Sequence, residues 1–182
     1  MTERHLDHRH LDLTGLARQG RSLSGATAQD ALPRLASSVC LDVLAVPEVT
    51  WSARPEWRPV PAGAPQLWLH LSAQTAVTLV CQRCLQTLTQ ALTVERSFLF
   101  VADEDEAVRL DEASDDDVLV LPKALDLQEL MEDELILALP IVPRHETCPE
   151  PLLISAAPEL ELESATHPFA ALAALRGGTK LN

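Results

Sequence analysis

Alternating apolar and polar residues mark the middle of the chain. The segment QLWLHLSAQTAVTLV, residues 66–80, places leucines at every second position early in its course, which is the period of a half-buried strand. Further runs rich in Val, Thr, Leu and aromatic residues lie between Val39 and Val101: SVCLDVLAV, VTWSARPEW and QTLTQALTVERSFLFV. The proline-rich stretch RPVPAGAPQ reads as a connecting loop. We therefore expect an antiparallel sheet of about four strands here, and a short last strand in VLVLP, residues 118–122.

A helical period replaces the alternation in LDLQELMEDELILALP, residues 125–140. Apolar residues recur every three or four positions, which predicts a long amphipathic helix at about 126–139. Asp126 at its start, with Glu129 three residues later, matches the capping-box pattern of a helix N-terminus. Pro140 ends the helix. The consecutive acids Glu132, Asp133 and Glu134 are expected on the solvated face. Shorter flanking helices are expected in TAQDALPRLAS, residues 27–37, and in PFAALAALRGG, residues 168–178.

These elements predict an α+β fold with a mainly antiparallel β-sheet and a single domain over residues 1–182. Within it we expect a flexible N-terminus at residues 1–10 and a partly mobile C-terminal region at residues 149–182. Residues 102–117 carry nine acidic residues against Arg109 alone, which favours a hydrated acidic loop that could attract a basic partner.

Charge restricts the partners. The chain has 27 acidic and 14 basic residues, and its formal net charge is -13. Because affinity for nucleic acids comes largely from Lys and Arg, tight and direct RNA binding is disfavoured, and a basic protein is the better electrostatic match. The N-terminal stretch is locally basic, and Arg18 and Arg21 are candidate contacts with a partner, as is Arg83.

Motif searches exclude the common enzyme classes. The chain contains no GxSxG elbow, P-loop, GxGxxG or HExxH motif, so neither a small-molecule substrate nor an enzymatic activity is expected. The N-terminus lacks the apolar stretch of a signal peptide, and no run is long enough to span a bilayer. Four cysteines are too few for a disulfide scaffold. We expect a cytoplasmic protein with reduced thiols and no contact with a membrane.

The segment VCQRCLQTL, residues 80–88, holds Cys81 and Cys84 between two strand-like runs. A strand, CQRC and a second strand would form a hairpin with a knuckle turn, a common zinc-binding element. His145 and Cys148 can complete a Cys3His set for a structural zinc ion. Two alternatives stay open: a purely structural turn, and a redox pair, although a redox pair prefers a helix after its first cysteine. Cys40 lies in an apolar run and is expected to be a buried small residue.

Four segments resemble, in order and spacing, the bacterial YceD family of large ribosomal RNA subunit accumulation proteins: LARQGRSLSG (16–25), CQRCL (81–85), EDELILALPIVPRHETC (132–148) and HPFAALAAL (167–175). Residues 36–66 match little, and the acidic stretch has its own length and composition. The motif residues in this chain are Cys81, Arg83, Cys84, Glu132, Asp133, Glu134, Pro140, Pro143, His145 and Cys148. No catalytic role comes with them.

The resemblance implies a non-enzymatic factor in ribosome biogenesis that supports synthesis, processing or accumulation of large-subunit ribosomal RNA. The expected partners are a large-subunit ribosomal RNA precursor, a basic ribosomal protein, or both. Two other functions compete with this one: a thiol oxidoreductase built on CQRC, and a zinc-stabilised interaction module unrelated to ribosomes.

Overall fold

The computed structural model of the chain describes residues 7–40, 46–61, 63–112 and 116–149. All of these residues belong to one compact unit, Met1–Glu150, while a second unit, Pro151–Asn182, lies outside the described residues. The predicted helix at residues 168–178 falls in that second unit, as does nearly all of the predicted mobile C-terminal region.

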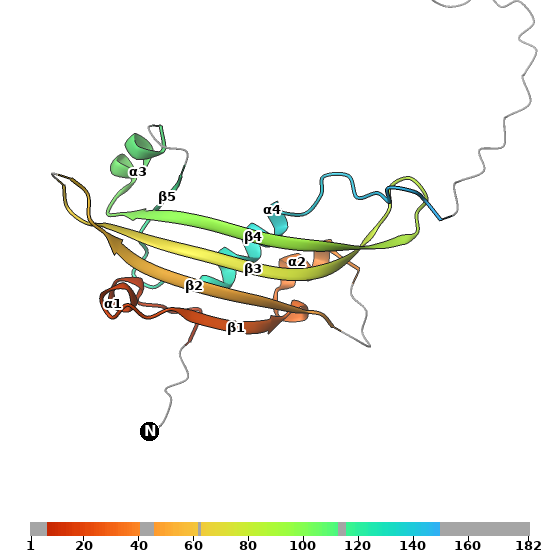
Figure 1. Cartoon of the computed structure of the whole chain (residues 1–182), viewed down its shortest axis with the longest axis horizontal. Helices are drawn as coiled ribbons and strands as arrows, with labels where there is room; N and C mark the ends of the chain where they lie inside the picture. The colour runs from red at the N-terminus through yellow and green to blue at the C-terminus, as the bar shows by residue number, and fades with distance from the viewer. Residues whose placement is uncertain (1–6, 41–45, 62, 113–115, 150–182) are drawn as a thin grey trace, which may run out of the picture. The chain divides into compact units, whose positions relative to one another are not determined.

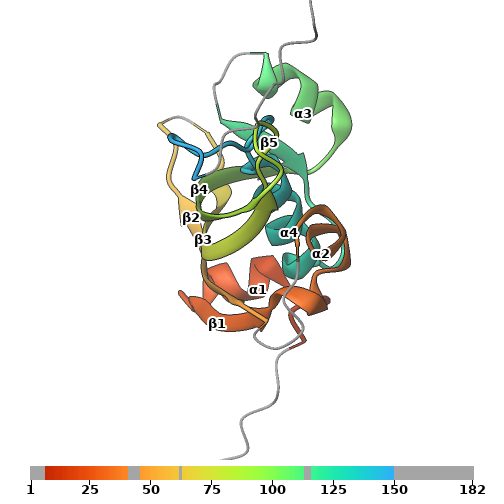
Figure 2. The same ribbon diagram turned by 90° about the vertical axis from the view of Figure 1, so that its right-hand side faces the viewer.

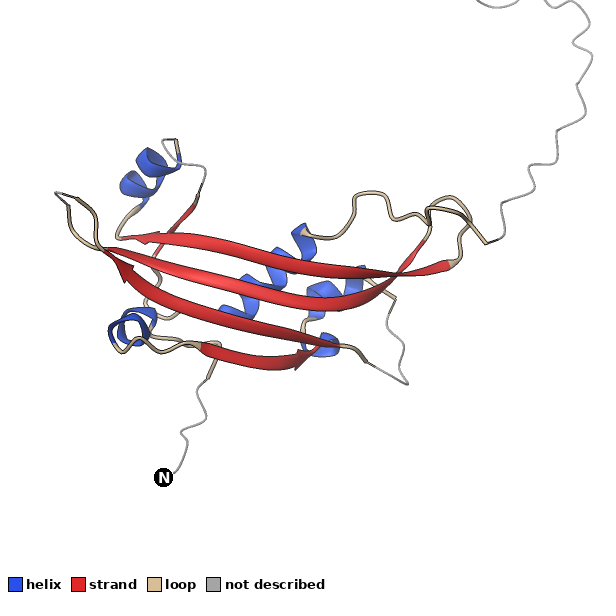
Figure 3. Cartoon of the chain, in the orientation of Figure 1, coloured by secondary structure: helices blue, strands red, loops and turns tan. Residues whose placement is uncertain are grey.

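A five-stranded sheet forms the centre of the described unit (Figures 1 and 3). Its strands are β1 (Leu23–Ala28), β2 (Glu48–Arg58), β3 (Gln66–Val80), β4 (Thr87–Val101) and β5 (Asp117–Val120), and they lie in sequence order. Every pair is antiparallel except β4 and β5, which are parallel. The predicted α+β class and mainly antiparallel sheet are therefore confirmed.

The parallel pair requires a crossover, and helix α3 (Glu104–Asp111) supplies it. Half of the acidic stretch predicted as a loop, Glu104–Asp111, is thus a helix. The Asp103 side chain caps α3 by accepting a hydrogen bond from the Glu106 backbone N–H, and acids in the first turn interact favourably with the helix dipole. Ala107 packs in a small cluster with Trp68, on the face of the sheet opposite the main core. Capping and this contact outweigh the repulsion between neighbouring acids.

Helices α2 (Pro33–Ser38) and α4 (Leu127–Leu137) cover one face of the sheet, as the two views show (Figures 1 and 2). Two further elements precede them in the chain: α1 (Leu13–Arg18) and the 3-10 turn η1 (Gln29–Ala31). The main core lies between this helical layer and the sheet, with Leu35, Val77 and Leu135 fully buried. Apolar burial at such positions stabilises the fold by roughly 25 cal/mol per Å².

Helix α4 differs from the long amphipathic helix predicted at 126–139, because it is 11 residues long. Its start is as expected: Asp126 accepts a hydrogen bond from the Glu129 backbone N–H. However, Glu132 and Glu134 are buried, at 5% and 9% exposure, so the predicted solvated face is wrong for these two residues. Each carboxylate is paired with an arginine from another element, which makes its burial tolerable.

Strand β1 is missing from the sequence-based prediction. Its sequence, LSGATA, consists mostly of small residues and shows no alternation of large apolar and polar residues. Only Leu23 is buried. At Gly25 a Cβ atom would lie 2.9 Å from the Trp51 side chain, so glycine permits the close approach of β1 to β2. The predicted strand SVCLDVLAV falls mostly on residues 41–45, outside the described residues. Cys40 is exposed, contrary to expectation.

Candidate metal centre

Four side chains from two distant segments converge at the β3–β4 end of the sheet. Cys81 and Cys84 lie in the turn between these strands, and His145 and Cys148 lie in the loop after α4. Their ligand atoms all lie within 4.8 Å of one another, and no other such group occurs among the described residues. The predicted Cys3His set is therefore brought together, as a group that could hold a metal ion.

Two of the ligand–ligand distances are close to those of a tetrahedral zinc site. With Zn–S near 2.3 Å and Zn–N near 2.0 Å, tetrahedral ligands are separated by roughly 3.8 Å for two sulfurs and about 3.6 Å for sulfur and nitrogen. The Cys81 and Cys148 Sγ atoms are 3.9 Å apart, and Cys84 Sγ lies 3.4 Å from His145 Nδ1. None of the described cysteines is in a disulfide. The donor set is complete without water, which is typical of structural rather than catalytic zinc.

The turn that carries the first pair has the backbone bonding of a tight knuckle. The Cys81 N–H donates to the Gln86 carbonyl at 2.9 Å, and the Leu85 N–H donates to the Cys81 carbonyl at 2.9 Å. Leu85 has φ 61, a left-handed conformation that a leucine rarely adopts. The chain thus holds a strained residue directly after Cys84, where the turn must close to bring both thiols to one point.

Backbone donors around Cys81 favour its thiolate. Burial raises the pKa of Cys81, but hydrogen bonds from the backbone N–H groups of Cys84, His145 and Arg83 lower it to about 5. For Cys84, the Gln86 backbone N–H lowers the pKa, while burial and the neighbouring Cys148 and Cys81 raise it, with a net rise. A cation at the centre would favour the thiolates of both residues.

Arg83, between the two cysteines, is part of this cluster. Its Nε donates to Cys148 Sγ at 3.0 Å, and its Nη2 donates to the backbone carbonyls of His145 and Glu146, each at 3.4 Å. The hydrogen bond to Cys148 raises the pKa of Arg83. Three thiolates around a divalent cation leave one excess negative charge, which this guanidinium offsets. Arg83 is predicted from the sequence to contact a partner, but in the structure its guanidinium donates to residues of the metal centre and its loop.

The two halves of the centre are also joined by main chain. The Gln82 backbone N–H donates to the Pro143 carbonyl at 2.9 Å, so the knuckle fixes the loop that follows α4. In that loop Ile141 is fully exposed and Val142 is 57% exposed. The knuckle therefore bonds directly to the loop in which these apolar side chains are exposed.

A buried carboxylate, that of Glu132, joins α2 to α4, although the sequence pattern predicts this acid on the solvated face. Glu132 Oε1 accepts hydrogen bonds from the backbone N–H groups of Arg34 at 2.7 Å and Leu35 at 3.0 Å. Its Oε2 accepts from Arg34 Nε at 3.1 Å, and this bond is the main reason that the pKa of Arg34 is raised. Because Leu32 stands at the N-cap of α2 and cannot cap it, Glu132 satisfies the free N–H groups from another helix.

Glu134 plays a similar part on the β4 side. Its carboxylate accepts from Arg96 Nε at 3.0 Å, and the same guanidinium lies 3.5 Å from the Asp117 carboxylate. Alternate acids of the EDE motif therefore connect α4 to different neighbours: Glu132 to α2 and Glu134 to β4. The sequence signal for this is weak: three consecutive residues span about 200° of a helix, so the outer two acids lie at the edges of the polar face, beside the apolar stripe.

A polar cluster lies on the other face of the sheet. His70 Nδ1 is 2.8 Å from Ser97 Oγ, and its Nε2 is 3.1 Å from Glu56 Oε1. This resembles a carboxylate–histidine–serine relay. However, Arg58 Nη2, which can only donate, lies 2.7 Å from His70 Nε2. His70 Nε2 therefore contacts both the carboxylate of Glu56 and the guanidinium of Arg58. Because Glu56 Oε1 also pairs with Arg58 Nε at 2.6 Å, the three side chains form an ion-pair network on this face of the sheet.

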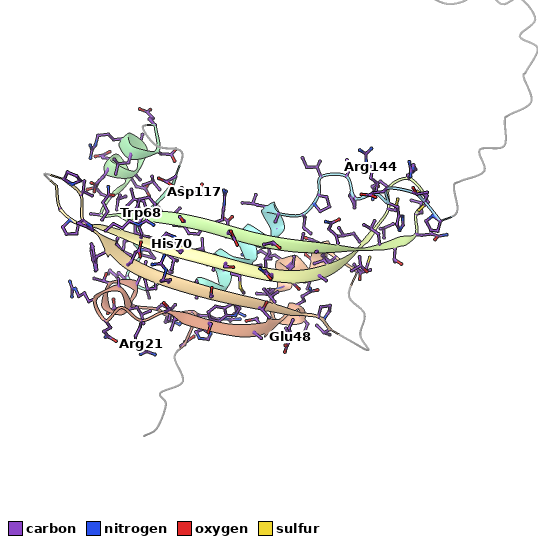
Figure 4. All side chains as sticks on the ribbon, in the orientation of Figure 1. Arg21, Glu48, Trp68, His70, Asp117 and Arg144 are labelled. Atoms are coloured by element: carbon purple, nitrogen blue, oxygen red, sulfur yellow. The ribbon has the colours of Figure 1, made fainter. Side chains whose placement is uncertain are left out.

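The remaining predicted partner contacts lie elsewhere. Arg18 is in the last turn of α1, and Arg21 follows it before β1; both are exposed. Figure 4 labels Arg21 near the N-terminal edge of the sheet and Arg144 at the opposite end. The structure therefore does not bring Arg18 and Arg21 together with Arg83, and their role in binding stays a prediction. Among the described helices, none combines the length and apolar character needed to cross a bilayer.

Comparison with known proteins gives two findings. The family model described as "Large ribosomal RNA subunit accumulation protein YceD" matches residues 69–176, which is more than half of the chain. A protein of Haemophilus influenzae named "Large ribosomal RNA subunit accumulation protein YceD" is 36% identical over 159 residues, covering 84% of this chain and 86% of that protein. No solved structure is significantly similar to the chain.

Proposed function

The chain belongs to the YceD family of large ribosomal RNA subunit accumulation proteins, and from this premise we propose that it supports the accumulation of large-subunit ribosomal RNA by binding rather than by catalysis. The observation that carries the proposal is the likeness to the Haemophilus influenzae protein, which extends over most of both chains. The matched region includes all four residues of the candidate metal centre. A factor of this kind works in the bacterial cytoplasm, where ribosomes are assembled.

Charge supports a protein partner as the principal contact. A net charge of -13 opposes a long contact with RNA phosphates and attracts basic proteins. Ribosomal proteins of basic character fit this requirement, with local RNA contacts from the exposed arginines Arg18 and Arg21 as a secondary contribution.

The metal centre has a structural role in this proposal. A zinc ion held by Cys81, Cys84, His145 and Cys148 would have no open position for a substrate. Its contribution would be cohesion, because it would fix the loop after α4 to the β3–β4 turn. The loop after α4, held in one position by these ligands, would then be available to contact a partner.

The thiol oxidoreductase alternative is less well supported. The lowered pKa of Cys81 would suit a redox thiol, but its side chain is fully buried and Cys84 is only 6% exposed. Attack on a partner's disulfide requires an accessible thiolate. Thiol labelling of the native protein discriminates between the readings: we expect exposed Cys40 to react first, and preferential reaction of Cys81 would favour redox chemistry.

Deletion of the gene tests the main proposal. We expect a reduced large-subunit peak in sucrose gradients and accumulation of unprocessed or degraded large-subunit RNA, both restored by the wild-type gene. A Cys84→Ser gene should restore them poorly, and a Cys40→Ser gene should restore them fully. An unchanged subunit profile in the deletion strain would refute the proposal, even if the purified protein binds metal.

A further inference from the structure

A second concave surface lies at the opposite end of the sheet from the metal centre. It is a groove of about 470 Å³, within the range of roughly 300–1,000 Å³ typical of binding pockets. The connection between β2 and β3, the end of β4, and α3 enclose it. Its lining is largely apolar and includes Trp57, Leu67, Phe100, Leu110 and Leu121.

Trp57 is the most conspicuous member of this lining. Its side chain is 39% exposed, whereas Trp51 and Trp68 are each only 6% exposed. An indole exposed beside a mostly apolar groove is a costly feature in an isolated protein, and tryptophan is among the residues that contribute most to protein interfaces. The groove therefore has both the volume and the aromatic surface to accept a large apolar side chain.

The helix that forms one wall of the groove, α3, is strongly acidic. Helix α3 contributes Glu106 and Arg109 to the lining, and these two side chains pair with each other at 3.6 Å. The other charged residues of α3 and its flanks are all acidic, and all are exposed: Asp103, Glu104, Asp105, Asp111 and Glu112. Arg109 is thus engaged by one acid, and the remaining carboxylates are exposed on the same helix and its flanks.

We propose that this groove docks a Lys- and Arg-rich protein segment that inserts one large apolar side chain beside Trp57 while its cations lie along α3. The apolar lining accounts for the inserted side chain, and charge complementarity accounts for the flanking cations. The same acids repel an RNA backbone, which makes RNA the less suitable occupant. The inference rests on the proposed function, because it names the site and the chemistry of a basic partner of a ribosome-assembly factor.

A synthetic, fluorescently labelled 16-residue peptide of Lys, Arg and Ser with one central Phe provides the probe, and anisotropy titration measures its affinity. Trp57→Ser should weaken binding by about tenfold at every salt concentration, as expected for an interface anchor. Replacing the central Phe of the peptide by Ser should have the same effect, and should add little to Trp57→Ser. Because Trp57 lies outside the main core, we expect the variant to fold, and thermal melting provides the check.

A charge variant of α3 tests the second half of the proposal. The quadruple change Glu104→Gln, Asp105→Asn, Asp111→Asn and Glu112→Gln should weaken binding by about tenfold at 50 mM salt and by much less at 500 mM, because screening removes the attraction. The matched control neutralises four exposed acids elsewhere: Asp30→Asn, Glu48→Gln, Glu95→Gln and Glu129→Gln. It changes net charge equally and should shift affinity less than about twofold.

Equal weakening by the α3 variant and its control would mean that only net charge matters, and would overturn the groove as a site. Tighter binding of a labelled single-stranded RNA than of the peptide would also overturn it, as would unchanged affinity in Trp57→Ser. The proposed function is tested separately. A normal subunit profile in cells that carry Trp57→Ser, with a depleted profile in the deletion strain, would refute the groove and leave the function standing.

Discussion

Replacing Glu132 by alanine should be among the most damaging single changes outside the apolar core. The substitution removes the acceptor of two backbone N–H groups at the start of α2, those of Arg34 and Leu35. It also removes the carboxylate that joins α2 to α4 through the Arg34 side chain. Alanine is a good helix former, so α4 itself should not be weakened by the change.

The magnitude follows from the bonds that are lost. Loss of a helix cap costs about 0.5–2 kcal/mol, and a hydrogen bond to a charged group contributes roughly 1.5–3 kcal/mol. Two backbone bonds to a carboxylate that is 6% exposed therefore predict a loss of about 3 kcal/mol in the free energy of unfolding. For a protein of this size, that loss corresponds to a decrease in Tm of about 6–12 °C.

Urea unfolding monitored by tryptophan fluorescence measures this quantity, and Asp133→Ala provides a matched control. Asp133 is the adjacent residue and pairs with the same arginine at 2.5 Å, but its side chain is 46% exposed. Its removal should cost less than about 1 kcal/mol. Arg34→Ala keeps both backbone N–H groups, so most of the Glu132→Ala effect should persist in that background. Equal costs for the two acids, or an effect of Glu132→Ala that vanishes with Arg34→Ala, would refute the capping role.

Three further predictions concern the metal centre and the polar cluster of the sheet. Protein purified without chelator should contain about one equivalent of zinc by elemental analysis, Cys84→Ser should abolish it, and Cys40→Ser should not; a metal-free wild type would contradict the assigned ligands. Arg83→Ala should weaken zinc affinity by about tenfold or more in a competition with a chromophoric chelator, and unchanged affinity would show that its contact with Cys148 is incidental. Hydrogen bonds from Arg58 and His70 lower the pKa of Glu56 from 4.5 to about 2. Because the folded-state pKa is lowered, the stability that Glu56 contributes is complete above pH 4.5 and is lost as the pH falls toward 2. The difference in urea midpoint between wild type and Glu56→Gln should therefore shrink between pH 6 and pH 3, and a constant difference would contradict the origin given for the low pKa.

The sequence predicts an element well when the residues of that element alone determine its secondary structure. The alternation in residues 66–80 and its continuation after CQRC correspond to β3 and β4, and Asp126 caps α4 as its spacing indicated. The Cys3His set was also within reach, because CxxC in a hairpin turn and HxxC in a proline-bounded loop each limit where the ligands can lie.

Elements that depend on distant neighbours were not predictable in this way. Strand β1 has no apolar alternation and exists because it pairs with β2 through residues such as Gly25. Helix α3 consists mostly of charged residues, and its stabilising contact with Trp68 is invisible in the sequence. Likewise, the acids at 132 and 134 look solvated until α2 and β4 are placed beside them.

The length of the β3–β4 hairpin has a consequence for partners. Each strand has 15 residues, which at about 3.3 Å per residue makes the hairpin a spacer of about 45 Å. Figure 4 shows Trp68 near one end of it and Arg144 near the other. A partner seated beside α3 would leave the loop after α4 uncovered. Under the proposed function, one molecule could therefore bridge two partners, and weak contacts at each end would reinforce each other through local concentration.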